Sequence, residues 1–131
     1  MLLAACLIVK DGAITLARCL DSVAGVVDEA LVYDTGATDG SQQLARNHGA
    51  TLVHGFWDDD FARARNDALA AVTAEWVLSI DADECASGDP AALRALLAGL
   101  AASVVAVERQ DVLPGATGSY RFRTLRLFRR S

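Results

Sequence analysis

The 131-residue sequence lacks several features that would assign a protein to a broad class at once. It has no apolar run long enough to cross a membrane, which takes about 20 residues in a helix. The apolar run at residues 1–9 ends in Lys10 and carries neither a basic flank nor a small-residue cleavage site, so we interpret it as a buried strand and not as a signal peptide. We expect a cytoplasmic protein, or one bound peripherally to the inner membrane.

Cysteine is scarce and shows no paired spacing. The chain has three cysteines, an odd number, which indicates neither a disulfide framework nor a zinc site. Cys6 falls in an apolar run and Cys19 on an apolar helix face, where cysteine behaves as a small hydrophobe. We interpret Cys85 as a small turn residue.

Positive charge is scarce except at the end of the chain. Residues 1–120 contain seven Lys or Arg against 17 Asp or Glu, whereas the last eleven residues contain five Arg and no acid. A nucleic-acid-binding protein would normally be basic overall, so that class of partner is not expected. For the basic end two interpretations stay open: contact with phosphate groups of a ligand or of anionic lipid, or a solvated flank of a strand.

Strand and helix patterns alternate along the chain. We expect strands at residues 3–9, 30–33, 51–53, 76–80, 103–108 and 120–128, and helices at 14–24, 42–47, 61–72 and 90–100. Asp60 and Asp89 are expected helix N-caps, with Asp58 and Asp59 as a solvated acidic cluster, and Gly115 and Gly118 suggest a hairpin before the last strand. The alternation predicts one α/β domain over residues 1–131 with a mainly parallel sheet. The chain ends inside a patterned strand, so we expect this domain to be incomplete.

Acidic residues follow three of the expected strands. Asp11 follows the first, Asp34 ends the second, and Asp81 begins an acidic segment after the fourth. Acidic residues are poor strand formers and costly to bury, and ligands of parallel sheets bind at the carboxyl ends of the strands. The pattern predicts a site for a metal and a hydroxyl-rich ligand at this edge.

The strongest candidate in this pattern is the pair Asp81 and Asp83. Alternate residues of an extended segment point the same way, and two close carboxylates repel each other unless a cation lies beside them. Mg²⁺ or Mn²⁺ takes one or two carboxylates and completes its shell with phosphate oxygens. An ordinary acidic turn is the alternative, but the position after a buried apolar strand, with Asp34 expected on a neighbouring strand, favours a metal site.

Two further residues are candidates for binding a ligand. Asp34 stands beside the Gly- and Thr-rich loop 35–40, where its carboxylate could accept hydrogen bonds from a base or ribose or could cap the loop in an Asx-turn; both readings stay open. The loop matches neither a dinucleotide fingerprint nor a P-loop. Arg65 lies in the first turns of a helix, where the dipole disfavours cations, so we expect it to pair with acids or with a phosphate. We assign no role to His48 or His54.

Several segments together resemble a known family. They are CLIVK at residues 6–10, RCLDSV at 18–23, VDEALVYDTGATDG at 27–40, FARARN at 61–66, WVLSIDADE at 76–84 and RLFR at 126–129. In this order and spacing they resemble the family 2 inverting glycosyltransferases of the GT-A fold, and among these the bacterial branch with lipopolysaccharide-core and peptide glycosyltransferases. The resemblance covers nearly the whole chain.

The resemblance implies a function and residue roles. A sugar would be transferred with inversion from a nucleotide donor, such as a UDP-sugar, to an acceptor hydroxyl. The acceptor would be a glycan, a lipid-linked sugar or a peptide, and the product would belong to a cell-envelope glycan. Asp34 would bind the base and Arg65 would lie near the diphosphate. Asp81 would contact the ribose or the metal, and Asp83 would be the direct ligand of Mn²⁺ or Mg²⁺.

The sequence departs from this family in two respects. The family usually has Asn-Glu after the lysine of the first strand, whereas Asp11-Gly12 follows Lys10 here; Lys10 and Asp11 remain candidates on the donor side. The family's general base is expected beyond Ser131, so we assign no catalytic base, and we expect Glu84 to support the metal turn.

A fragment that binds a nucleotide sugar without transferring it is the main alternative. A nucleotidyltransferase is weaker, because the loop after the first strand is neither Gly-rich nor basic. A dehalogenase-type phosphatase is weaker still, because no lysine follows Lys10.

Overall fold

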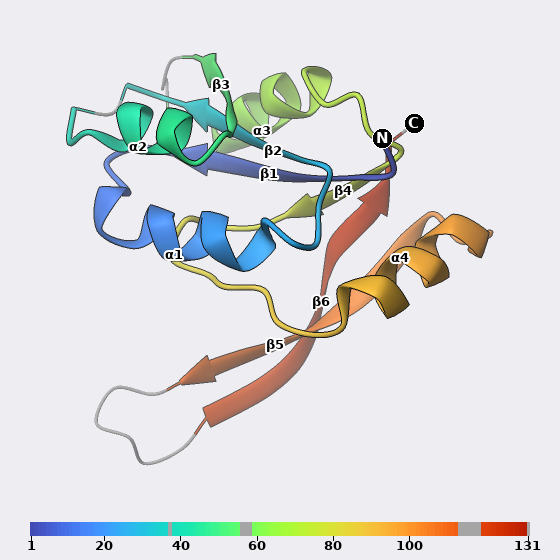
Figure 1. Ribbon diagram of the computed structural model, residues 1–131. Helices are drawn as coiled ribbons and strands as arrows, with labels where there is room; N and C mark the ends of the chain where they lie inside the picture. The colour runs from blue at the N-terminus through green and yellow to red at the C-terminus, as the bar shows by residue number, and fades with distance from the viewer. Residues whose placement is uncertain (37, 56–58, 113–118, 131) are drawn as a thin grey trace.

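The computed structural model describes residues 1–36, 38–55, 59–112 and 119–130, with backbone alone at 104–106, 108–112 and 119–125. In chain order the elements are β1(Leu3–Val9), α1(Ala13–Val23), β2(Glu29–Asp34), α2(Ser41–Asn47), β3(Thr51–His54), α3(Phe61–Ala70), β4(Trp76–Ser79), α4(Pro90–Gly99), β5(Val104–Val112) and β6(Ser119–Arg129) (Figure 1). Every expected element is present, although β5 is longer than expected. Gly115, Gly118 and Asp58 lie outside the described residues.

The strands form one six-stranded sheet in the order β3-β2-β1-β4-β6-β5. Pairing is parallel from β3 to β4, and β6 runs antiparallel to both β4 and β5. The prediction of an α/β fold with a mainly parallel sheet is therefore confirmed. The expectation that Asp34 and Asp81 follow neighbouring strands is wrong, because the most apolar strand, β1, takes the central place between β2 and β4.

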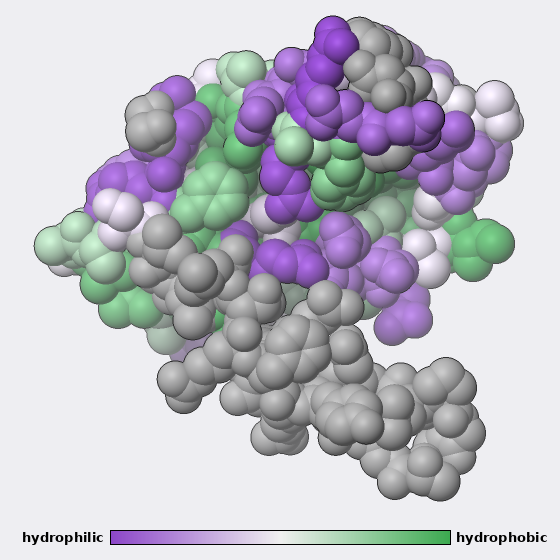
Figure 2. All heavy atoms as spheres, turned by 180° about the vertical axis from the view of Figure 1, so that it is seen from behind, coloured by the Kyte–Doolittle hydropathy of each residue, from purple (hydrophilic) through white to green (hydrophobic). Residues whose placement is uncertain are grey.

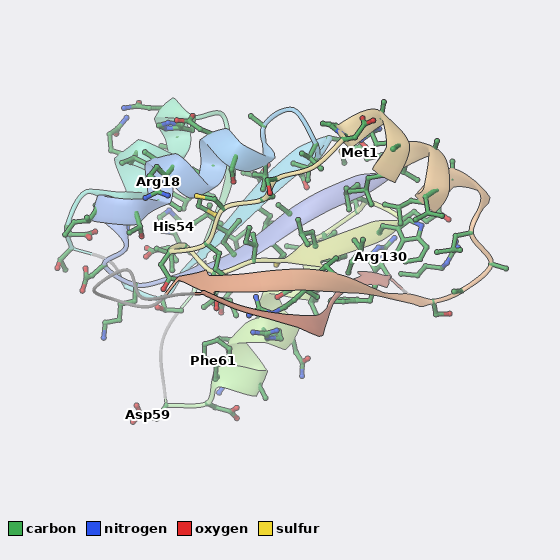
Figure 3. The ribbon with its side chains drawn as sticks, turned by 90° about the horizontal axis from the view of Figure 1, so that it is seen from below. Met1, Arg18, His54, Asp59, Phe61 and Arg130 are labelled. Atoms are coloured by element: carbon green, nitrogen blue, oxygen red, sulfur yellow. The ribbon has the colours of Figure 1, made fainter. Side chains whose placement is uncertain are left out.

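Helices cover both faces of the parallel part, which explains why β1 is apolar on both sides. The helices α1 and α2 lie on one face and α3 on the other (Figures 1 and 3). On the first face the buried residues of α1 pack with alternate residues of β1: Leu16, Cys19, Leu20 and Val23 with Ala5, Leu7 and Val9. On the second face α3 and the turn after it pack with the other set: Ala64, Ala68 and Val72 with Ala4 and Cys6.

The face that carries α3 has polar and apolar residues exposed on its outside. Arg63, Asn66 and Asp67 are exposed on α3. In the view of this face, hydrophilic side chains gather over the upper part, and hydrophobic atoms are visible in the hollowed middle (Figure 2). Asp60 is the N-cap of α3, accepting from the Arg63 N–H at 3.0 Å, as expected from the sequence.

A third apolar cluster joins the hairpin and α4 to the parallel strands. Leu97 of α4 and Leu127 of β6 are buried against Leu3 and Trp76. Asp89 caps α4 with Pro90 in the first turn, as predicted. Within the described residues, no helix combines the length and apolar character that spanning a membrane requires.

Candidate functional site

The carboxyl ends of β1, β2 and β4 lie at one edge of the sheet. The parallel register pairs Val9 with Asp34, and Cys6 with Ser79. His54 and Phe61 lie toward this edge, whereas Met1 and Arg130 lie together at the opposite end (Figure 3). The predicted site residues therefore gather at one end of the molecule.

Asp34 is buried, with 3% of its surface exposed. Its carboxylate accepts a hydrogen bond from the Gly36 N–H at 3.2 Å and another from the Gln42 side-chain amide. His54 Nδ1 lies 3.7 Å from Asp34 Oδ2. The Asx-turn interpretation is thus confirmed as a structural role. Gln42 and His54 were not predicted, because no local pattern indicates which side chains fold back onto a buried carboxylate.

Hydrogen bonds join the loop after β1 to the loop after β2. Asp11, at φ 56°, accepts from the Thr38 N–H at 2.8 Å. Asp39 accepts from the Ala13 N–H at 2.9 Å, and Ser41 Oγ accepts from the Gly12 N–H at 3.1 Å. Hydrogen bonds from Ser41 and from the Ala13 N–H lower the pKa of Asp39.

Gly12 packs closely against the acidic segment after β4. A Cβ at this position would lie 3.3 Å from both the Ala82 Cβ and the Val9 Cγ1. This contact is tighter than side chains usually allow, so the glycine lets the first loop approach Ala82, which lies between Asp81 and Asp83. The departure from the family pattern at residue 12 therefore has a packing role.

The acidic segment forms a closed turn. The Glu84 N–H donates to the Asp81 carbonyl at 2.9 Å, and the Asp81 N–H donates to Glu84 Oε1 at 2.8 Å. The Asp81 side chain is half-exposed and Asp83 is exposed. Cys19 Sγ donates to the Asp81 carbonyl at 3.4 Å, which ties the turn to α1. Glu84 thus supports the turn, as expected.

Arg126 of β6 reaches this turn from the hairpin. Its Nη1 donates to Glu84 Oε1 at 2.7 Å and to the Ser79 carbonyl at 3.3 Å, and its Nη2 lies 3.6 Å from Asp81 Oδ2. Arg129 pairs with Glu75 and lies over the Trp76 ring at 4.7 Å. The interpretation of the basic end as a solvated flank is wrong for these two arginines, because the sheet places β6 against the acids that flank β4.

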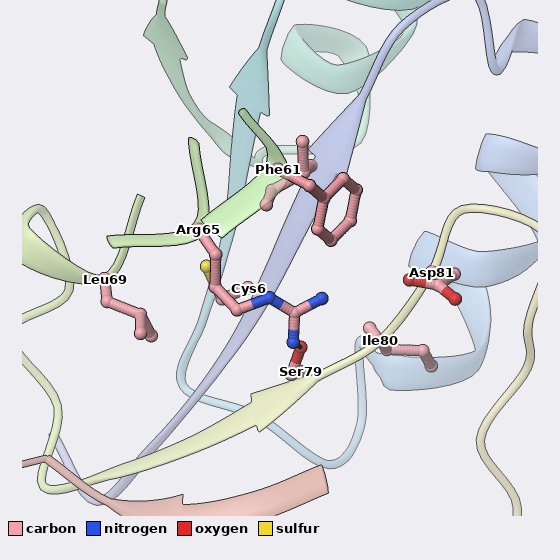
Figure 4. A pocket seen from close by; sticks show the side chains of 8 residues that line it. Cys6, Phe61, Arg65, Leu69, Ser79, Ile80 and Asp81 are labelled. Carbon is pink, nitrogen blue, oxygen red and sulfur yellow. Dashed lines mark hydrogen bonds between the residues drawn. The ribbon is translucent and has the colours of Figure 1, made fainter. Parts of the chain in front are cut away.

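Arg65 extends from α3 toward the end of β4. Its Nη1 donates to Ser79 Oγ at 3.2 Å, and its guanidinium lies 5.1 Å from the centre of the Phe61 ring. These residues line a hollow with Ile80 and Asp81 (Figure 4). The structure therefore brings Arg65 and Asp81, but not Asp34, to one hollow; Asp34 lies on the other side of β1.

Asp81 and Asp83 fit a metal ion whose coordination shell is completed by the phosphate oxygens of a bound ligand. Among the described residues, no three His, Cys, Asp or Glu side chains form a group that could hold an ion. Mg²⁺ and Mn²⁺ do not need such a group, because they bind one or two carboxylates together with water and phosphate oxygens. The expectation that the two side chains point the same way from an extended segment is wrong, because residues 81–84 form a hydrogen-bonded turn. Asp81 is half-exposed and Asp83 is exposed, so both carboxylates are open to solvent and could act as oxygen ligands.

Parts of the sequence are similar to known proteins. A TPR repeat-containing protein of Synechococcus elongatus is 52% identical over 79 residues, which cover 60% of this chain and 20% of that protein. An uncharacterized glycosyltransferase of Rickettsia felis is 33% identical over 82 residues, covering 63% and 29%. The chain thus spans less than a third of the length of these relatives.

Solved structures share the fold. Glucosyl-3-phosphoglycerate synthase of Mycobacterium tuberculosis, in complex with Mn²⁺, UDP and glucosyl-3-phosphoglycerate, matches with a TM-score of 0.56 and 25% identity over 62% of this chain and 33% of that one. Its complex with UDP alone matches at 0.63 and 24% identity over 79% and 42%, a likeness of fold alone. The strand order and flanking helices are those of the GT-A fold. The family model of glycosyl transferase family 2 matches residues 6–130, and the chain therefore belongs to that family.

Proposed function

We propose that the chain binds the nucleoside diphosphate of a sugar donor, with Mn²⁺ or Mg²⁺ held by Asp81 and Asp83. We further propose that the protein transfers the sugar with inversion to an acceptor hydroxyl. The observation that carries the proposal is the position of the closed acidic turn beside the Arg65 hollow, at the carboxyl edge where open parallel sheets bind ligands.

Each candidate residue has a place in this proposal. Arg65 is already oriented by Ser79 and Phe61, so its guanidinium can meet a diphosphate without a large loss of side-chain freedom. Asp34 is buried at the carboxyl end of β2, and in this proposal its carboxylate accepts a hydrogen bond from the base.

Lys10 and Asp11 contribute at the start of the first loop. Lys10 is exposed at the carboxyl end of β1, where its charge attracts the donor. Asp11 holds the loop after β2 through Thr38, and so fixes the wall next to Asp34.

The metal supplies one chemical contribution. When bound, the cation stabilises negative charge on the departing diphosphate as a Lewis acid. Asp83 and Asp81 hold it, and the Glu84 hydrogen bond to the Asp81 N–H keeps the two carboxylates in a fixed turn. No general base is assigned.

Calorimetry with UDP and Mn²⁺ tests the donor site. We expect UDP binding that depends on Mn²⁺ in the wild-type chain and weakens at least about tenfold in Asp83→Ala, because one of two protein ligands is lost. Asp21→Ala removes the same charge from an exposed position on α1 and should bind like the wild type. The donor-site proposal fails if the wild-type chain shows no Mn²⁺-dependent binding of any nucleoside diphosphate.

A second candidate is binding of the donor without transfer. Incubation with several UDP-sugars and Mn²⁺ distinguishes the two candidates, since release of UDP that is lost in Asp83→Ala contradicts a purely binding role.

A further inference from the structure

Three carboxylates stand within four residues of the turn, at positions 81, 83 and 84. Such a group is unfavourable without a cation, because like charges at short range repel. Arg126 meets two of them: it lies 2.7 Å from Glu84 Oε1 and 3.6 Å from Asp81 Oδ2. The Arg126 and Glu84 side chains are 19% and 18% exposed, so solvent screens their interaction only in part.

We propose that Arg126 is the resident counter-ion of this turn and keeps the affinity for a divalent cation low until a nucleotide is bound. This inference rests on the proposed metal at Asp81 and Asp83. Arg126 is a positioning residue, since it contacts the turn and not the reacting groups.

The contacts of Arg126 with Glu84 and Asp81 differ, and each has its own consequence for the turn. Through Glu84 Oε1, which also accepts from the Asp81 N–H, Arg126 holds the turn closed. Its second nitrogen faces the Asp81 carboxylate at a distance longer than a hydrogen bond, so this carboxylate can turn to another cation. A cation bound there is repelled by the guanidinium, and the negative charge of a diphosphate offsets that repulsion.

Mn²⁺ titration without nucleotide tests the inference, with free Mn²⁺ followed by electron paramagnetic resonance. We expect Arg126→Gln to bind Mn²⁺ about fivefold more tightly than the wild type, or more, because the repelling charge is gone. Arg126→Lys keeps the charge and should stay near the wild-type affinity. Arg129→Gln loses the same charge from the same strand, where Arg129 pairs with Glu75, and should also bind like the wild type.

Thermal unfolding gives a second measurement. Without metal, Arg126→Gln should melt about 3 °C or more below the wild type, and Mn²⁺ should raise its Tm by more than it raises that of the wild type. If Arg126→Gln is unfolded without metal, Mn²⁺ should refold it. An Arg126→Gln variant whose Mn²⁺ affinity is unchanged or weaker, or that Mn²⁺ does not stabilise, overturns the inference.

The two proposals fail in different ways. If the wild type binds Mn²⁺ with UDP but Arg126→Gln gains no affinity for Mn²⁺ alone, the counter-ion role is wrong and the donor site stands. If Arg126→Gln binds Mn²⁺ alone more tightly while neither chain binds UDP, Arg126 is the counter-ion of the turn, but the release by a nucleotide and the donor site are both wrong.

Discussion

At the scale of single residues, the same chemical group has different roles in different surroundings. Asp34 ends β2 and Asp83 follows β4, yet Asp34 is buried and held by Gly36 and Gln42, whereas Asp83 is exposed. A buried carboxylate must have its lone pairs satisfied by protein donors, and an exposed one keeps them for water or a cation. Asp34 is therefore part of the rigid wall of the site as well as a candidate ligand of the base.

The three cysteines should differ in reactivity for the same reason. Burial raises the pKa of Cys6 to about 11 and that of Cys19 to about 12, so both thiols stay protonated at pH 8, and Cys85 is exposed. We expect a disulfide reagent to titrate one thiol in the folded chain and three in urea. The folded Cys85→Ser variant should then show no reactive thiol. Fast reaction of a second thiol in the folded chain would contradict the buried positions of Cys6 and Cys19.

At the scale of elements, the first turn of α1 is capped by residues from a distant segment of the chain. Gly12 precedes this helix and offers no side chain as a cap. The N–H groups of Gly12 and Ala13 instead donate to Ser41 and Asp39, which lie at the start of α2. The first turn of α1 is thus capped by the next loop of the fold, and the two loops of the site are joined as a result.

The helix α4 offers a matched pair of substitutions. Leu97 is 1% exposed and packs with Trp76 and Leu127, whereas its neighbour Leu96 is 50% exposed. Urea unfolding should show a loss of about 2 to 5 kcal/mol in Leu97→Ala, because a cavity is left in the third cluster. Leu96→Ala should cost less than about 1 kcal/mol. Equal losses in the two variants would show that α4 does not pack through Leu97.

At the scale of the whole molecule, ion pairs join the later part of the chain to the earlier part. Arg94 of α4 pairs with Asp28, Arg126 with Glu84, and Arg129 with Glu75. The uneven charge of the sequence is thus balanced partly inside the fold. Asp28 also accepts from the Leu3 N–H at 3.1 Å and so fixes the start of the central strand.

The pH dependence of stability should reflect Asp28. Its pKa is lowered by hydrogen bonds from the Leu3 and Leu2 N–H groups and by Arg94. A lowered pKa in the folded state stabilises the fold above the unfolded value of about 4, and this contribution is lost as the pH falls through the folded pKa. We expect Asp28→Asn to lower the free energy of unfolding at pH 7, with a difference from the wild type that shrinks below pH 4.

A control separates this effect from a general change of charge. Asp21→Asn alters an exposed carboxylate that is 73% accessible, so it should have little effect at either pH. A difference between Asp28→Asn and the wild type that stays constant from pH 7 to pH 3 would contradict the ionic role of Asp28.

The sequence by itself determined the elements and indicated where the candidate site lies. Apolar periodicity placed the strands and helices, because burial of one or both faces imposes a repeat of 2 or 3.6 residues. Acids after strands indicated the binding edge, and the caps at Asp60 and Asp89 were predicted because capping depends on adjacent residues.

The tertiary structure alone decided which distant residues meet. The place of β1 between β2 and β4, the partners of Asp34, and the contact of Arg126 with Glu84 join residues 8 to 73 positions apart. Such contacts depend on strand order and on how loops fold over the sheet edge, and no local pattern encodes either. The acidic turn is therefore visible in the sequence, whereas its counter-ion is visible only in the fold.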